Sequence, residues 1–288
     1  MLLEIGVFDA YASAFEYAPP TGHRQNDLRM FYSHPKWKRI PGTYTDDCEM
    51  SVAIAELLVE RKPWTPINIA QKFVDVFHRN NQRTGYSRHF YEFLCNTQNG
   101  KDFLSKIKPD SEKSGAAMRA GPLGVIADTK QLLQMCELQA RITHNTDKGV
   151  CSAQAAALMA HYFIYDLGPK NNLGEFLENH LQGKRFGHDF SLPWKGKVHP
   201  PGLEAVCAAI TAIQSSNSMA EVLIKCVNYG GDTDTVAAIS AGPASFSKEI
   251  LQNTPENLIL TLENSGYGKD FLVKLDTQLF REISYFGA

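Results

Sequence analysis

The segment Tyr229-Gly-Gly-Asp-Thr-Asp-Thr235 places two glycines before two carboxylates and two hydroxyls, and a mostly apolar run at 236–241 follows it. Adjacent glycines allow the backbone a tight turn, and the apolar run indicates a buried helix. The segment therefore predicts hard oxygen ligands at the start of a helix. A second acidic group, Thr45-Asp46-Asp47, begins another segment with helical periodicity, far earlier in the chain. The fold depends on whether these two helix starts meet.

The composition is that of a globular protein with nearly balanced charge. The 288 residues carry 29 Lys and Arg against 31 Asp and Glu, so no global field favours a nucleic acid or an anionic membrane. No stretch approaches the roughly 20 apolar residues of a membrane span, and the opening residues lack a signal-peptide pattern. The six cysteines are widely spaced, which predicts reduced thiols. We therefore expect a cytoplasmic monomer whose partner is a small molecule or a modified protein.

Apolar residues recur at helical spacing through most of the chain. Segments rich in Pro and Gly at 19–42 and 183–201 predict two long connections. We find no stretch with the sustained alternation of a strand. The sequence predicts an all-α single domain that spans residues 1–288, with one helix after Pro66 and others at 3–16, 46–61, 86–97, 114–127, 129–143, 148–165, 172–181, 202–214, 218–228, 234–242 and 268–283.

Each acidic group has a structural and a chemical interpretation. Asp46, with Glu49 three residues later, fits a capping box, and Asp232 fits a helix cap with Asp234 in the first turn. One cap needs a single side chain, however, and adjacent acids with a flanking hydroxyl occur twice. If the groups converge, repulsion among the carboxylates requires protons or a cation. Oxygen ligands without His or Cys favour Mg²⁺, Mn²⁺ or Ca²⁺ over Zn²⁺, and the EF-hand spacing of a calcium sensor is absent.

Two further segments lie between the acidic groups. The small residues of Ser114-Gly-Ala-Ala-Met-Arg-Ala-Gly-Pro122 allow backbone N–H groups to bind a phosphate, although close helix packing is the simpler explanation of glycine and alanine alone. Ile142-Thr-His-Asn145 follows an apolar helix, where a lone histidine usually caps the C-terminus. Neither segment by itself predicts a ligand.

Five short motifs follow one another between residues 6 and 235. They are Gly6-x-x-Asp9-Ala10 with Glu16, Tyr44-Thr-Asp-Asp47 with Met50, Gly115-Ala-Ala-Met-Arg119, Thr143-His144, and Gly230-Gly-Asp-Thr-Asp-Thr235. In this order they resemble the ADP-ribosylglycohydrolase family, which includes the dinitrogenase-reductase-activating glycohydrolase and the ADP-ribosylarginine and ADP-ribosylserine hydrolases. The pairing of the first acidic group with the glycine-rich one is specific to that family, whereas either group alone is a weak signal.

The resemblance implies a compact orthogonal helical bundle with a cleft that holds a dinuclear centre of two divalent cations, Mg²⁺ or Mn²⁺. By position in the motifs, the implied metal ligands are Thr45, Asp46, Asp47, Asp232, Asp234 and Thr235. The implied ADP-ribose contacts are Ser114, Gly115, Ala116, Met118 and His144. Glu16 matches an acidic residue that lies near the metals and the scissile ribose in some members.

The implied activity is hydrolysis of the glycosidic bond that links ADP-ribose to an acceptor, with release of ADP-ribose. We expect the acceptor to be a protein side chain, arginine rather than serine, because acids in the cleft favour a cationic guanidinium. Two alternatives stay open: a catalytically inactive ADP-ribose-binding protein and a metal-dependent phosphohydrolase. The expected catalytic residues are Glu16, Asp46, Asp47 and Asp234, with no sole general base assigned among them. The candidate rings for stacking the adenine are Tyr86, Phe90, Tyr229 and Tyr267.

Overall fold

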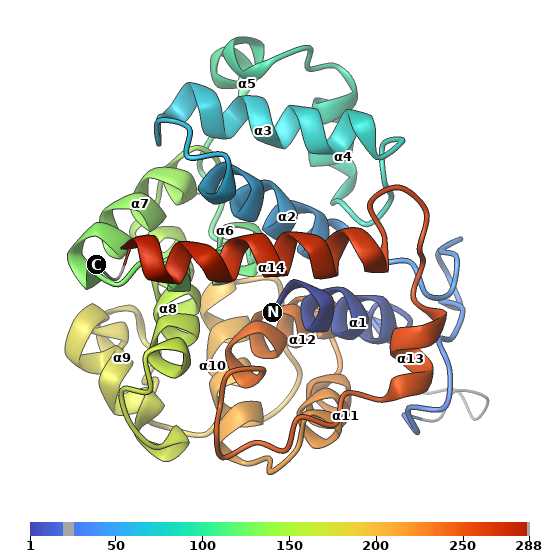
Figure 1. Cartoon of the computed structure of the whole chain (residues 1–288), viewed down its shortest axis with the longest axis vertical. Helices are drawn as coiled ribbons and strands as arrows, with labels where there is room; N and C mark the ends of the chain where they lie inside the picture. The colour runs from blue at the N-terminus through green and yellow to red at the C-terminus, as the bar shows by residue number, and fades with distance from the viewer. Residues whose placement is uncertain (20–25, 287–288) are drawn as a thin grey trace.

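The helix that follows the two glycines, α12 (Thr233–Ala244), is buried along its whole length at the centre of the structure (Figure 1). The computed structural model describes residues 1–19 and 26–286, and side chains as far as residue 283. Alanine, glycine and serine are frequent in α12 and let neighbouring helices approach it closely. Those neighbours are α1 (Leu2–Ala12), α8 (Asp147–Ile164), α10 (Gly202–Gln214) and α11 (Met219–Tyr229).

The other acidic group begins α2 (Asp46–Val59), which packs against α1, α3 (Pro66–Arg79) and α14 (Lys269–Phe286). Figure 1 shows α14, drawn in red, running across the middle of the view between α2 and α1. The remaining elements are α4 (Arg88–Cys95), α5 (Gly100–Lys106), α6 (Gly115–Met118), α7 (Thr129–Arg141), α9 (Leu173–Leu181) and α13 (Glu256–Thr261), with 3₁₀ helices η1 (Gly121–Val125), η2 (Lys170–Asn172) and η3 (Gly183–Phe186).

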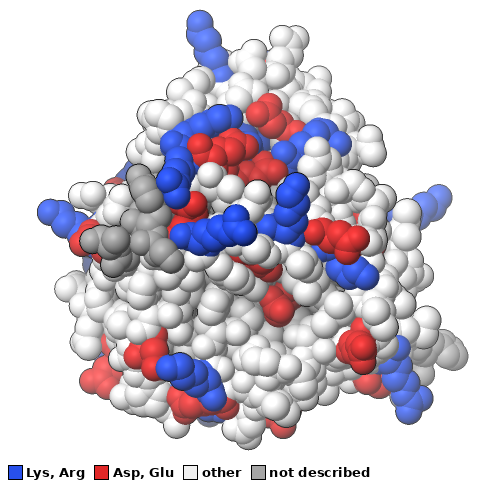
Figure 2. All heavy atoms as spheres, in the orientation of Figure 1, with Lys and Arg blue, Asp and Glu red and all other residues white. Residues whose placement is uncertain are grey.

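Within residues 1–19 and 26–286, the backbone forms helices, turns and isolated β-bridges but no strand. The predicted all-α fold is therefore confirmed. No helix in this described part of the chain is long and apolar enough to cross a membrane. Figure 2 shows acidic and basic side chains beside one another on the face seen in Figure 1, in keeping with the balanced charge.

Helix boundaries differ from the predicted ones for identifiable reasons. The single helix predicted at 114–127 is divided into α6 and η1. Pro122 has no N–H to donate to the Met118 carbonyl, which accepts a hydrogen bond of 3.0 Å from Ser51 Oγ instead. Two helices that the sequence did not predict, α5 and α13, have 7 and 6 residues, too few to show a clear period. The first helix ends at Ala12, earlier than predicted.

The two predicted long connections are mostly irregular. Residues 26–42 of the first connection contain no helix, and residues 20–25 lie outside the described residues. The second connection, 183–201, begins with the short η3 and continues without a helix. Each of these two connections contributes residues to the functional site.

Close contact between η1 and α8 explains the glycine at position 124. A Cβ atom on Gly124 would lie 2.6 Å from Ala160 Cβ and 2.7 Å from His161 N. Side chains do not tolerate distances this short, so glycine lets η1 approach the backbone of α8. Gly121, in the same 3₁₀ helix, has more room, because Ile5 Cδ1 would lie 4.0 Å from its added Cβ.

Gly124→Ala should lower the free energy of unfolding by about 1–3 kcal/mol, the usual effect of overpacking a core. Gly121→Ala is the matched control, because the added methyl group fits, and it should change that free energy by less than about 0.5 kcal/mol. Urea denaturation followed by circular dichroism measures both variants. Equal stability of the two variants would contradict the close contact.

Candidate metal centre and binding cleft

The two glycines that precede Asp232 fix this residue at the start of α12. Gly230 and Gly231 have φ values of +68° and +82°, a region that side chains rarely adopt. A Cβ atom on Gly231 would lie only 1.8 Å from the Val198 carbonyl oxygen. The Asp232 N–H donates to that oxygen (3.2 Å), and the Gly231 carbonyl accepts from Tyr17 N (2.8 Å). Residues from two distant segments therefore hold the turn in place.

The other helix start is held by Asp9 of α1. Its buried carboxylate accepts hydrogen bonds from Thr45 N (2.8 Å), Thr45 Oγ1 (2.8 Å) and Cys48 N (3.0 Å). The Thr45 hydroxyl accepts in turn from Asp47 N and caps α2. Asp9 thus joins α1 to the first turn of α2. In the sequence, Asp9 belongs to the motif Gly6-x-x-Asp9-Ala10, whose pattern does not indicate these contacts.

The side-chain caps expected of Asp46 and Asp232 are wrong, although Asp234 does lie in the first turn of α12. Glu49 does not return to the helix start, because it accepts hydrogen bonds from Tyr86 Oη (2.6 Å) and Asn80 Nδ2 (2.8 Å). Asp232 is the N-cap residue of α12, yet its side chain makes no capping hydrogen bond. It accepts from Ser114 Oγ at 3.3 Å instead. Thr45 rather than Asp46 therefore caps α2, and the Asp232 carboxylate does not cap α12.

The two helix starts bring their carboxylates together. One oxygen from each of Asp9, Asp47 and Asp234 lies within 4.8 Å of the other two, and the same holds for Glu16, Asp232 and Asp234. Asp234 belongs to both groups and links them. Asp46 lines the same cleft as Glu16, Asp47, Asp232 and Asp234, whereas Asp9 is buried and does not line it. We use the name acid cluster for the cleft-lining carboxylates Glu16, Asp46, Asp47, Asp232 and Asp234.

Two oxygens of the acid cluster are buried without a protein partner. Asp47 Oδ1 and Asp234 Oδ1 accept no hydrogen bond from the described residues. A buried carboxylate oxygen without a partner is costly, and a hard cation would supply one. Mg²⁺ and Mn²⁺ prefer carboxylate and hydroxyl oxygens, which are the atoms gathered here. The residues present therefore fit a divalent cation.

The pKa values of these acids are raised, first by burial and then by neighbouring charge. Burial, with the charge of Asp234 next, raises the pKa of Asp9 to about 7 and that of Asp232 to about 8. The same two causes hold the pKa values of three more acids well above their ordinary range, namely Glu16, Asp46 and Asp47. Without a cation, the site therefore retains protons near neutral pH.

The acid cluster lines a cleft of about 760 Å³, within the usual range for small-molecule sites. Thr235 lines this cleft, whereas Thr45, the remaining predicted metal ligand, is buried and not among the lining residues. Of the predicted ADP-ribose contacts, the cleft is lined by Ser114, Gly115, Met118 and His144. Ala116 does not line it, because its side chain is fully buried.

A buried chain of hydrogen bonds sets the protonation of His144. Arg119 Nη2 donates to Thr143 Oγ1 (2.8 Å), and that hydroxyl lies 2.7 Å from His144 Nδ1. Among the described residues, His144 Nδ1 is the acceptor that the buried Thr143 hydroxyl proton reaches, so that proton points to Nδ1 and the ring carries its own proton on Nε2. Burial lowers the pKa of His144 to about 3, so the ring is neutral. His144 thus offers a neutral N–H beside Gly115 rather than capping α7.

An apolar and basic wall completes the cleft. Phe90 and Phe93 stack there with their ring centroids 5.7 Å apart, and Lys106, Lys108 and Lys113 line the same cleft. Of the four rings considered for adenine, Phe90 is the one that lines the cleft. Phe93 and the lysines were not predicted from the sequence, because their segments carry no motif that separates them from other surface residues.

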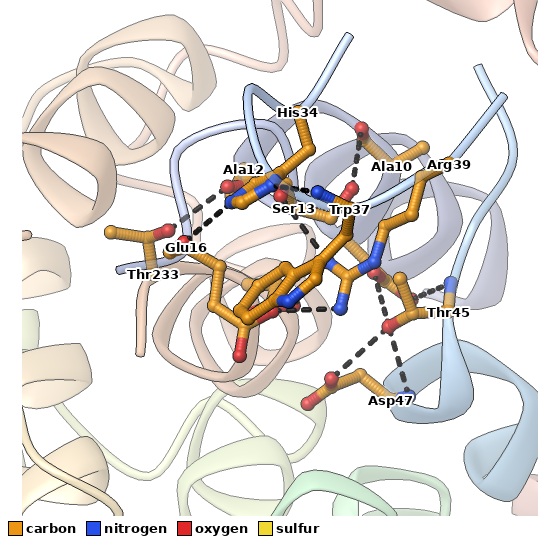
Figure 3. A network of polar contacts seen from close by, with 12 residues as sticks. Ala10, Ala12, Ser13, Glu16, His34, Trp37, Arg39, Thr45, Asp47 and Thr233 are labelled. Atoms are coloured by element: carbon orange, nitrogen blue, oxygen red, sulfur yellow. Dashed lines mark hydrogen bonds and ion pairs between the residues drawn. The ribbon is translucent and has the colours of Figure 1, made fainter. Parts of the chain in front are cut away.

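Arg39 is a further residue of the site that was not predicted from the sequence. Figure 3 shows its guanidinium beside the Glu16 side chain. Arg39 Nη2 donates to Glu16 Oε2 at 2.8 Å, and Nη1 lies 3.5 Å from Asp234 Oδ2. Arg39 lies in the irregular segment 26–42, where neither periodicity nor a motif distinguishes it from the other basic residues.

A family model described as ADP-ribosylglycohydrolase matches residues 6–244. The chain belongs to the ADP-ribosylglycohydrolase family. The matched part includes both acidic helix starts and the small-residue segment 114–122. The family resemblance seen in the sequence is therefore confirmed.

Relatives in the ADP-ribosylglycohydrolase family are distant but align over most of the chain. An uncharacterized protein of Archaeoglobus fulgidus is 28% identical over 97% of this chain and 94% of its own. The ADP-ribosyl-[dinitrogen reductase] glycohydrolase of Rhodospirillum rubrum is 27% identical over 86% of this chain and 79% of its own. The ADP-ribosylarginine hydrolase Tri1 of Pseudomonas putida is 20% identical over 82% of this chain and 66% of its own.

A solved structure described as an ADP-ribosylglycohydrolase-related protein complex has the same fold. It superposes with a TM-score of 0.74 at 22% identity and covers 97% of this chain and 95% of its own. The predicted helical bundle of the ADP-ribosylglycohydrolase type is therefore confirmed.

The raised pKa values predict how stability depends on pH in the absence of divalent cations. The pKa of Asp232 is about 8 in the folded protein against an ordinary value of 3.8, so folding strengthens proton binding. The stability due to this proton is complete below the unfolded pKa and is lost as pH rises through the folded pKa. The melting temperature in EDTA should therefore fall between about pH 6 and pH 9, and Mg²⁺ or Mn²⁺ should restore it.

Asp232→Asn provides the control for this measurement, because it removes the titrating carboxyl and keeps the shape of the side chain. Its melting temperature in EDTA should fall less over the same interval. A wild-type melting temperature that does not change with pH in EDTA would show that the acids do not hold these protons.

Proposed function

We propose that this protein hydrolyses the glycosidic bond between ADP-ribose and a modified protein side chain, with arginine favoured over serine, and releases ADP-ribose. The observation that carries the proposal is the convergence of Asp47 and Asp234, each with an unpartnered buried oxygen, at a cleft of suitable size. Family membership supports this reaction class. The names of the Rhodospirillum rubrum and Pseudomonas putida relatives support a modified protein as substrate, and the second supports arginine.

Two divalent cations, Mg²⁺ or Mn²⁺, would be held by oxygen atoms of the two helix starts. The proposed ligands are Thr45, Asp46, Asp47, Asp232, Asp234 and Thr235. When bound, the cations polarise the substrate and lower the pKa of a bound water. The hydroxyls of Thr45 and Thr235 hydrogen-bond Asp9 and Asp232, so each threonine also orients a neighbouring carboxylate.

The carboxylates of the acid cluster would act on the reaction directly. Cleavage at the anomeric carbon of a ribose passes through an oxocarbenium-like state that carries positive charge. Negative side chains around the cleft stabilise that charge, and a carboxylate accepts the proton of the attacking water. We propose Asp46, Asp47 and Asp234 for these roles, and Glu16 for orienting the ribose hydroxyls or the water.

The wall formed by residues 114–118 would hold the rest of the ADP-ribose. The proposed contacts are Ser114, Gly115, Ala116, Met118 and His144. The N–H groups of Gly115 and Ala116 precede the first backbone hydrogen bonds of α6, so they can bind phosphate oxygens. His144 adds a neutral donor, and the lysines of the cleft add positive charge. Phe90 is the proposed ring for the adenine.

Incubation of the protein with an arginine-ADP-ribosylated protein and Mg²⁺ or Mn²⁺ should release free ADP-ribose, which chromatography measures. Asp47→Asn should lower kcat/KM by about 100-fold or more, because it removes a charge from the reacting centre. Asp75→Asn is the matched control, since Asp75 is an exposed acid on α3 that does not line the cleft, and it should leave kcat/KM unchanged.

A serine-linked substrate in the same assay should be hydrolysed more slowly than the arginine-linked one. Release of phosphate or AMP would indicate a phosphohydrolase. Tight binding of ADP-ribose without any hydrolysis, at high enzyme concentration and with both cations, would indicate an inactive binding protein. Either result contradicts the proposed function.

A further inference from the structure

Arg39 contacts two of the three carboxylates in one of the candidate cation sites. Glu16, Asp232 and Asp234 form that group. The Arg39 guanidinium pairs with Glu16 Oε2 at 2.8 Å and with Asp234 Oδ2 at 3.5 Å. Its side chain is only 12% exposed, so the pair is shielded from water and salt. A fixed positive charge thus lies where a divalent cation would bind.

The surrounding residues hold this guanidinium in place (Figure 3). Arg39 Nη1 donates to the Ser13 carbonyl at 3.2 Å, and the guanidinium carbon lies 4.8 Å from the centroid of the Trp37 ring. Trp37 stacks in turn on His34, with centroids 4.1 Å apart and planes 13° apart. These contacts therefore hold the Arg39 side chain in one position.

His34 fixes the other end of this stack. The backbone N–H groups of Lys36 and Trp37 donate to His34 Nδ1 at 3.1 and 2.9 Å. Because Nδ1 accepts, Nε2 carries the ring proton and donates to the Glu16 carbonyl oxygen at 2.7 Å. The segment that supplies Arg39 is thus attached to the residue whose carboxylate Arg39 neutralises.

In the other group of carboxylates, formed by Asp9, Asp47 and Asp234, the ion pairs of the described residues join Arg39 to Asp234 alone. Asp47 Oδ1 and Asp234 Oδ1 are buried and without a partner among the described residues. The guanidinium contacts Asp234 through the other oxygen, Oδ2. Asp234 therefore presents one oxygen to Arg39 and leaves one for a cation, so the two candidate cation sites are unequal.

We propose that Arg39 is a built-in competitor for the cation site formed by Glu16, Asp232 and Asp234. A cation binds first near the unpartnered oxygens of Asp47 and Asp234. A second cation binds only as the guanidinium leaves Glu16, because two positive charges repel each other at this distance. The inference rests on the two-cation centre of the proposed function and adds that Arg39 makes the two binding steps unequal.

Isothermal titration calorimetry with Mn²⁺ tests this on the full chain. Wild-type protein should bind one ion tightly and a second ion more weakly. Arg39→Gln should strengthen the weaker step by roughly tenfold or more and leave the tighter step nearly unchanged. Arg39→Lys, which keeps the charge, should stay close to wild type. Arg29→Gln is the matched control, because Arg29 lies in the same segment with its side chain 82% exposed.

A second measurement uses wild-type protein and does not depend on a variant at position 39. Departure of the guanidinium removes a partner from the Trp37 ring, so tryptophan fluorescence should change with the second Mn²⁺ ion and not with the first. Trp37→Phe should abolish that change and leave the fluorescence of the other tryptophans.

The outcomes separate this inference from the proposed function. Two binding steps that Arg39→Gln leaves unchanged, or a weaker step that becomes weaker still, would overturn the competition and leave the two-cation centre intact. A second Mn²⁺ ion that binds without a Trp37 signal would also overturn it. Wild-type protein that binds no Mn²⁺ would overturn both the cation centre and the competition.

Discussion

Electrostatic repulsion among buried carboxylates is the constraint on which the site depends. Two carboxylates about 4 Å apart repel each other by roughly 4 kcal/mol at an effective dielectric constant of 20. In the acid cluster, oxygens of Glu16, Asp232 and Asp234 lie within 4.8 Å of one another, and burial adds the loss of hydration. The protein moderates this repulsion with raised pKa values, with one guanidinium and with two helix N-termini, whose partial positive charge favours acids. A divalent cation would remove most of the repulsion that is left.

The fold supplies the force that holds these acids together. The small side chains of α12 allow α1 to pack closely against it. Thr233 Oγ1 also donates to the Ala12 carbonyl at 2.9 Å. Asp9, farther back in α1, holds the first turn of α2. One helix therefore positions both acidic helix starts. Ser114, Gly115, Met118 and His144 line the same cleft as the acids.

The sequence predicted the parts of the site that are local to a helix start. Both acidic groups, the glycine turn and the helical class follow from short motifs and periodicity. In the structure, the carboxylates of the two acidic groups lie in one cluster. The capping residue of α2 could not be predicted from the sequence, because Thr45 and Asp46 both suit a cap. The hydrogen bond from Thr45 to the distant Asp9 decides between them. The position of Arg39 could not be predicted either, because an irregular connection has no periodicity from which to infer where its side chains lie.

The most direct test of the metal centre is X-ray diffraction from crystals soaked in Mn²⁺, with anomalous data collected to locate the ion. The account predicts an anomalous peak about 2.0–2.6 Å from both Asp47 Oδ1 and Asp234 Oδ1. Crystals that show no peak at the acid cluster, with these two oxygens bonded to protein groups instead, would contradict it.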